Sequence, residues 1–144
     1  MKILVLDPGN STGWMFYDEG TKELHGGTIG ERLDDIYFLF DMFKPDRIIY
    51  ETFALYPGKA QAMSWNTFYP CEVIGVIKLW AVRNLVVCTD QGAACKKYSG
   101  GLDDRWITFK QRVYPNTGWF KITEHTKDAY MHLRYFLRNN TIYT

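Results

Sequence analysis

The chain has 144 residues, of which 47% are hydrophobic and 17% aromatic, and its formal net charge is +1. This length fits one domain over residues 1–144, with enough apolar residues to build a core without disulfide or zinc staples. The three cysteines form no Cys-x-x-Cys pair, so we expect buried free thiols and exclude a disulfide-rich secreted domain and a disordered chain.

The first third of the chain predicts an antiparallel meander followed by a crossover. Strands are expected over residues 2–7, 13–18 and 22–29, separated by turn residues. Residues 31–45 carry apolar side chains at helical spacing and end on a proline, and residues 46–51 form a short β-branched run. We therefore expect a helix that crosses over to a fourth strand parallel to the first.

The rest of the chain predicts two more helices and one strand. Helical spacing runs from Lys59 to Arg83, with Pro70 at a helix start or a kink, and residues 84–89 predict a fifth strand. Residues 123–140 predict a closing helix with one apolar stripe. This order predicts an α/β fold in which a five-stranded mixed sheet is covered by helices on both faces.

Two of the predicted strands end in an acid. Asp7 follows four apolar residues and precedes a Pro-Gly turn, and Glu51 closes the fourth strand. Ligand sites in such sheets lie beyond the carboxyl ends of the strands, so both acids reach one edge if the strands are neighbours. Each acid also has an ordinary explanation, as a turn opener for Asp7 and as a sheet-edge charge for Glu51.

The closing helix adds a His-x-x-Asp pair, His125 and Asp128, behind Thr123 as the predicted N-cap. Glu124 and His132 have the spacing to point toward the same side. Solvated first-turn residues are the ordinary alternative. A cluster of carboxylates is unstable without a cation, because like charges raise one another's pKa. Hard oxygens favour Mg²⁺ or Mn²⁺, and an imidazole shifts the preference somewhat toward Mn²⁺.

Charge is distributed unevenly along the chain. Residues 1–72 hold 6 Lys and Arg against 11 Asp and Glu, whereas residues 73–144 hold 11 against 5. Basic residues alternate with aromatic ones after residue 95, a pattern that suits a DNA-binding surface but also an ordinary solvated face. The candidate phosphate-binding residues are Lys96, Lys97, Arg105 and Lys110.

Four motifs together resemble the RuvC-like Holliday junction resolvases of the RNase H-like superfamily. They are "ILVLDPGNSTGW", "IIYETF", "CKKYSGG" followed by "FKQRV", and "HTKDAYMHL", in the order and approximate spacing of that family. The resemblance implies an RNase H-like fold, two divalent metal ions, a homodimer and paired nicking of four-way DNA junctions. It also implies Asp7, Glu51 and Asp128 as catalytic metal ligands, with His125 in the place of the remaining ligand.

In a two-metal mechanism Asp7 bridges ions about 3.5–4 Å apart. His125 either ligates a metal ion or orients and deprotonates the attacking water. Because the chain is short and diverges after Glu51, it resembles a compact phage-type member. Two other functions stay open: an actin-like phosphotransferase or ATPase fragment, suggested by "DPGNSTGW", and a non-catalytic protein that binds DNA junctions.

Two further features bear on partners. Phe53 and Tyr56 follow Glu51 on a predicted loop, where they could stack on unpaired bases or pack in the core. The predicted helix around residues 59–82 is the candidate dimer interface, unless both its sides pack within one protomer. Its apolar residues are Met63, Trp65, Phe68, Tyr69, Ile74, Ile77 and Trp80. No segment has the length of a signal peptide core or a membrane span, so we expect a cytoplasmic protein, bacterial or in a phage-infected cell, without a small-molecule cofactor.

Overall fold

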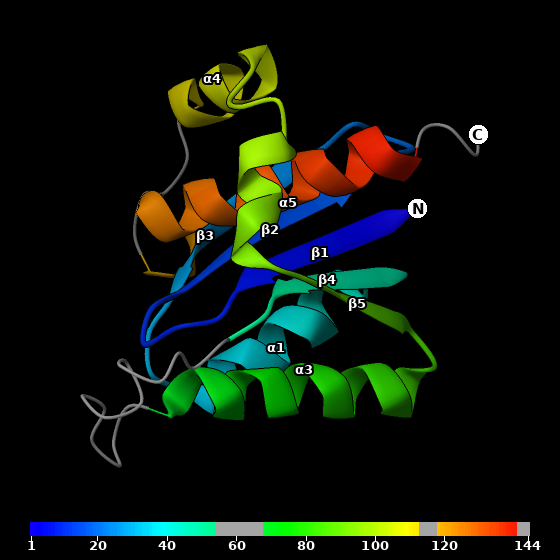
Figure 1. Cartoon of the computed structure of the whole chain (residues 1–144). Coiled ribbons are helices and arrows are strands. Elements are labelled where there is room, and N and C mark those ends of the chain that lie inside the picture. Colours follow the sequence, from blue (N-terminus) through cyan, green and yellow to red (C-terminus); the bar gives the residue numbers. More distant parts are fainter. Residues whose placement is uncertain (54–67, 113–117, 141–144) are drawn as a thin grey trace.

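A five-stranded mixed sheet forms the centre of the protein (Figure 1). The computed structural model describes residues 1–53, 68–112 and 118–140. The strands are β1 (Lys2–Asp7), β2 (Thr12–Asp18), β3 (Leu24–Ile29), β4 (Arg47–Glu51) and β5 (Val87–Gln91). Their order across the sheet is β3-β2-β1-β4-β5. The first three strands pair antiparallel, and β4 and β5 continue the sheet parallel to β1.

Helices cover both faces of this sheet (Figure 1). One face carries α1 (Leu33–Phe43) and α3 (Tyr69–Asn84), and the other carries α5 (Glu124–Asn140) with α4 (Asp104–Gln111) beside it. Two short 3₁₀ segments, η2 (Ala93–Tyr98) and η3 (Gly118–Phe120), connect the elements of the second half. The α/β architecture with helices on both faces is therefore confirmed.

Strand β1 is buried on both faces and so joins two hydrophobic clusters. Leu4 and Leu6 pack toward α1 and α3, whereas Ile3 and Val5 pack toward α5. This alternation follows from the period of two along a strand. Asp7 is the next residue in the strand, at the point where the apolar run stops. The buried strand thus delivers this carboxylate to the edge of the sheet.

Several details differ from the sequence-based expectations. Helix α4 and segment η2 were not predicted, and residues 59–67 of the predicted long helix lie outside the described residues, together with Met63 and Trp65. Ile77 and Trp80 pack in the core under the sheet, so their assignment to a dimer interface is wrong. The cysteines are free thiols as expected, but their expected burial is wrong: Cys88 and Cys95 are half-buried, and Cys71 is exposed on α3. No helix within the described ranges is long and apolar enough to cross a membrane.

The first turn of α5 lies directly on strand β2. A Cβ atom added at Gly13 would stand 1.9 Å from the backbone oxygen of His125, so only glycine permits this approach. The Thr126 hydroxyl donates to the Gly27 carbonyl oxygen at 2.9 Å, and the Thr28 and Thr123 hydroxyls lie 2.7 Å apart. These contacts fix the start of α5 at the end of the sheet where Asp7 lies.

Replacing Gly13 with alanine tests this close approach. Because the added methyl group overlaps backbone rather than a flexible side chain, we expect G13A to lower the free energy of unfolding by about 3 kcal/mol. Urea unfolding followed by circular dichroism measures the change. G75A is the matched control: Gly75 is exposed within α3 with open space around it, so alanine there should stabilise the protein slightly. Equal stability of G13A and wild type would contradict the assignment.

Candidate active site

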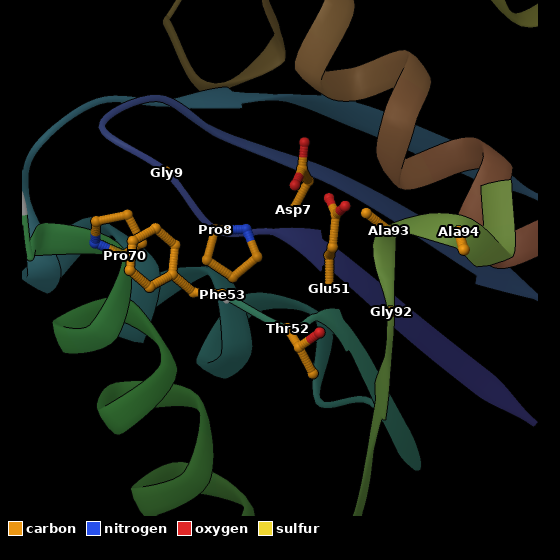
Figure 2. Close-up of a pocket in the computed structure, with 10 residues that line it drawn as sticks. All are labelled: Asp7, Pro8, Gly9, Glu51, Thr52, Phe53, Pro70, Gly92, Ala93 and Ala94. Atoms are coloured by element: carbon orange, nitrogen blue, oxygen red, sulfur yellow. The ribbon is translucent and has the colours of Figure 1, made fainter. Parts of the chain in front are cut away.

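Strands β1 and β4 bring two carboxylates side by side. The strands pair in parallel with Leu6 opposite Tyr50, so the next residue of each strand is an acid, Asp7 or Glu51. Figure 2 shows the two side chains next to one another at the rim of a hollow of about 540 Å³. The hollow is lined by Asp7, Pro8, Gly9, Glu51, Thr52, Phe53, Pro70, Gly92, Ala93 and Ala94.

The two acids do not ionise independently. Burial, a hydrogen bond with Glu51 and the negative charges of Glu51 and Asp128 raise the pKa of Asp7 to about 9. Burial alone would also raise the pKa of Glu51, but contacts with His132 and Asp7 and the charge of Lys96 lower it to about 2. Burial and mutual repulsion therefore disfavour ionisation of both carboxyl groups at once, and nearby positive charge favours it.

Helix α5 contributes the remaining members of the predicted cluster. Thr123 caps it, since its hydroxyl accepts a hydrogen bond from the His125 N–H at 3.2 Å. His125 Nδ1 lies 3.8 Å from Asp7 Oδ2, and Asp128 lies one turn further along the helix. Glu124 does not join them, because its exposed carboxylate pairs with Lys127 at 2.6 Å.

Lys96 is the cation at this site. Its Nζ atom lies 3.4 Å from Glu51 Oε1 and 3.6 Å from Asp128 Oδ2. Burial lowers the pKa of Lys96, but the charges of Glu51, Asp128 and Asp7 outweigh burial and raise it above its usual range. Segment η2 therefore places an ammonium group where the carboxylates require positive charge.

The side chains of the predicted cluster have the chemistry of ligands for a divalent metal ion, but they do not converge on one point. Three carboxylates and an imidazole at one sheet edge are ligands that Mg²⁺ and Mn²⁺ accept. Within the described residues, however, no three such side chains surround a common point. Instead, the Lys96 ammonium contacts both Glu51 and Asp128, and the Asp7 carboxyl lies beside Glu51. A metal ion bound between Glu51 and Asp128 would take the place of the Lys96 ammonium.

The other predicted DNA-binding residues lie at different places. Phe53 lines the same hollow as the acids, and Tyr56 lies outside the described residues. Lys97 is exposed and lines a second hollow of about 680 Å³ together with Tyr98, Gly100, Tyr135, Arg138 and Asn139. Lys110 is exposed in the last turn of α4.

Arg105 lies apart from the acids. Its guanidinium carbon stands 5.7 Å from the ring centre of Tyr17, and Tyr17 pairs with Ile3 at the start of β1. Arg105 is therefore at the end of the sheet opposite Asp7, because α4 packs against that end. The structure does not bring it together with the acids.

Sequence reasoning missed one residue beside the acids, Gln91. It closes β5 next to Glu51 in the parallel register, and its side chain is buried. The rule that pointed to Asp7 and Glu51, a polar residue at the carboxyl end of a strand, also points to Gln91. His132, considered from its helical spacing, is fully buried and contacts both Gln91 and Glu51.

Comparison with known proteins found similar solved structures, but no similarity at the level of sequence families. No protein-family model and no curated protein matches the sequence. RuvC of T. thermophilus in complex with Holliday junction substrate has a TM-score of 0.63 and 16% identity over 98% of both chains. A second Thermus thermophilus RuvC structure has a TM-score of 0.60 and 17% identity over 98% of both chains.

A third solved structure is the yeast mitochondrial Holliday junction resolvase Ydc2. Its TM-score is 0.53 at 9% identity, covering 94% of this chain and 77% of that chain. The two RuvC matches extend over 98% of both chains, so the likeness concerns the arrangement of nearly all of the chain. The chain therefore has the RNase H-like α/β fold of RuvC and Ydc2.

Proposed function

We propose that this protein is a metal-dependent nuclease that resolves four-way DNA junctions by paired, symmetric nicks. The observation that carries the proposal is the meeting of Asp7 and Glu51 at adjacent strand ends, with His125 and Asp128 reaching the same edge from α5. The fold is shared with a RuvC that has been solved with its Holliday junction substrate, which supports junction DNA as the substrate.

Three of the four residues share one role in this proposal, and His125 has another. Asp7, Glu51 and Asp128 hold two Mg²⁺ or Mn²⁺ ions, and His125 completes the set. Two such ions supply a lowered pKa for an attacking water and positive charge for the leaving 3′ oxygen. Burial and the neighbouring acids raise the pKa of Asp7, so bound divalent cations would favour its ionised form. His125, which is exposed beside Asp7, ligates an ion or takes a proton from the water.

The surroundings of the acids suit a branched DNA strand. Phe53 lies on the wall of the hollow across from the acids, near Pro70, in position to stack on an unpaired base (Figure 2). Lys96 already contacts the carboxylates, so it can turn to a phosphate bound beside them. Lys97 extends positive charge along η2.

A homodimer matches the twofold symmetry of a four-way junction, which has two strands to cut. Helix α3 supports this part of the proposal with two exposed apolar residues, Leu79 and Val82. The site of action is the cytoplasm of a bacterial or phage-infected cell, where such DNA is found.

The first prediction concerns Asp7. We expect D7N to cut a synthetic four-way junction in Mg²⁺ at less than about a thousandth of the wild-type rate, since the exchange removes the charge that binds the ions. Junction binding should survive or tighten, because repulsion between carboxylate and phosphate is relieved. Gel assays of cleavage and of binding measure both, and E51Q and D128N should behave alike.

Two controls make this experiment decisive. D90N changes an acid on β5 that lines a different hollow, so it should cut at the wild-type rate. A linear duplex of the same sequence should stay intact with wild type. Cleavage by D7N at the wild-type rate would refute the metal assignment. Binding without cleavage by wild type would favour the non-catalytic junction-binding function.

The second prediction concerns His125. Replacement with alanine should slow cleavage by about a hundredfold or more, because a ligand or proton acceptor is lost. Replacement with aspartate should keep Mg²⁺-supported cleavage and reduce any preference for Mn²⁺, since it restores a hard oxygen ligand. Cleavage rates in each metal measure this. H125A with wild-type rates in both metals would show that His125 is neither ligand nor proton carrier.

The third prediction concerns the basic residues of the second half. If Lys97 contacts a phosphate, K97A should weaken junction binding and reduce the magnitude of the slope of log K against log salt by about 0.9. Binding titrations at several salt concentrations give the slope, and a parallel change is expected for K110A. R83A, exposed in the last turn of α3, is the control and should keep the wild-type slope. An unchanged slope in K97A would assign Lys97 to an ordinary solvated surface.

A further inference from the structure

His132 is a buried polar residue beside the acids whose role the proposed mechanism does not use. It lies one helical turn after Asp128 on α5, and none of its surface is exposed. Its neighbours on the helix, Ala129 and Leu133, pack in the hydrophobic cluster between α5 and the sheet. An imidazole there costs free energy unless polar partners compensate the loss of water.

Two polar side chains flank the His132 ring. Nδ1 lies 2.7 Å from Oε1 of Gln91, which is itself buried at the end of β5. Nε2 lies 3.5 Å from Oε2 of Glu51, and within the described residues this buried nitrogen forms no hydrogen bond. The ring therefore connects β5 to the carboxylate at the end of β4.

The two oxygens of Glu51 face different partners as a result. Oε2 points to His132, inside the protein, and Oε1 points to Lys96 on the side of Asp128. A carboxylate held through one oxygen keeps the other available in a fixed direction. Buried partners of this kind orient metal-ligating side chains, and their loss typically weakens metal binding by about 10- to 100-fold.

We propose that His132, which is held in place by Gln91, is a positioning residue. It fixes the Glu51 carboxylate so that Oε1 faces Lys96 and Asp128, where a metal ion would bind. This inference rests on the proposed function, because it assigns Glu51 as a metal ligand. It differs from the possibility that His132 is a ligand itself: the ring lies beneath Glu51 and is closed off by the core. Its effect passes through Glu51.

Three variants of the full chain test the proposal. H132L introduces an apolar side chain of similar size and so removes both contacts, whereas H132Q restores a polar group at that position. Q91L removes only the contact between Gln91 and His132. Binding of Mn²⁺, followed through the electron paramagnetic resonance of the free ion, is the main readout. Thermal unfolding and junction affinity without metal are measured alongside.

We expect H132L to weaken Mn²⁺ binding by about 10-fold or more, while junction affinity without metal stays at the wild-type value. H132Q should recover part of the loss. Q91L should weaken Mn²⁺ binding less than H132L, and the double variant H132L/Q91L should be no weaker than H132L, because both act through one contact. A purely structural role for His132 would lower thermal stability without this pattern in Mn²⁺ affinity.

The outcomes separate the two proposals. If wild type binds Mn²⁺ and cuts junctions, but H132L or Q91L binds Mn²⁺ as tightly as wild type, the positioning role is overturned and the nuclease function stands. If wild type neither binds Mn²⁺ nor cuts junctions, the proposed function fails, and the positioning role with it. Should H132L not fold, Q91L decides, since it leaves the buried ring in place.

Discussion

Parallel pairing of β1 with β4 forces two acids, Asp7 and Glu51, to share one edge of the sheet. The pairing itself is fixed by buried apolar residues on both strands, so the acids cannot separate without disrupting the core. Their mutual repulsion and loss of hydration must therefore be compensated locally. The Lys96 ammonium and the His132 imidazole provide this compensation, each from a different element.

The start of α5 depends on the same edge. Gly13 and the threonine contacts of the first helical turn place His125 and Asp128 against the strand ends. The sheet and helix are thus joined at the point where charge is concentrated, and the polar groups of one element meet those of the other. This arrangement explains why residues far apart in the sequence form one cluster, as the proposed nuclease function requires.

Much of this could be predicted from the sequence, because local patterns determine it. Apolar runs that stop at Asp7 and Glu51 mark the strand ends, and helical spacing places His125 and Asp128 on one side. The position of Lys96 could not be predicted, since η2 is a short 3₁₀ segment without periodicity and its contacts are tertiary. Helix α4 has only Trp106 and Phe109 buried, too few for an apolar stripe, although Asp103 caps it at the Trp106 N–H. Because α4 was not predicted, the position of its residue Arg105 at the end of the sheet opposite Asp7 was not predicted either.

In the proposed metal site, the contact of Lys96 with Glu51 and Asp128 would contribute to the measured affinity for a metal ion. The cluster is already neutralised in part, so under the proposed function metal loading would be an exchange in which an ion replaces an ammonium group tethered to the chain. A tethered competitor is present at a fixed local concentration and cannot be diluted away. The apparent dissociation constant then includes the free energy of releasing Lys96, in the way that any ligand's affinity is reduced when the binding-competent state is the minor one. A double charge is favoured over a single one in such an exchange, which selects against monovalent ions without any change in ligand geometry.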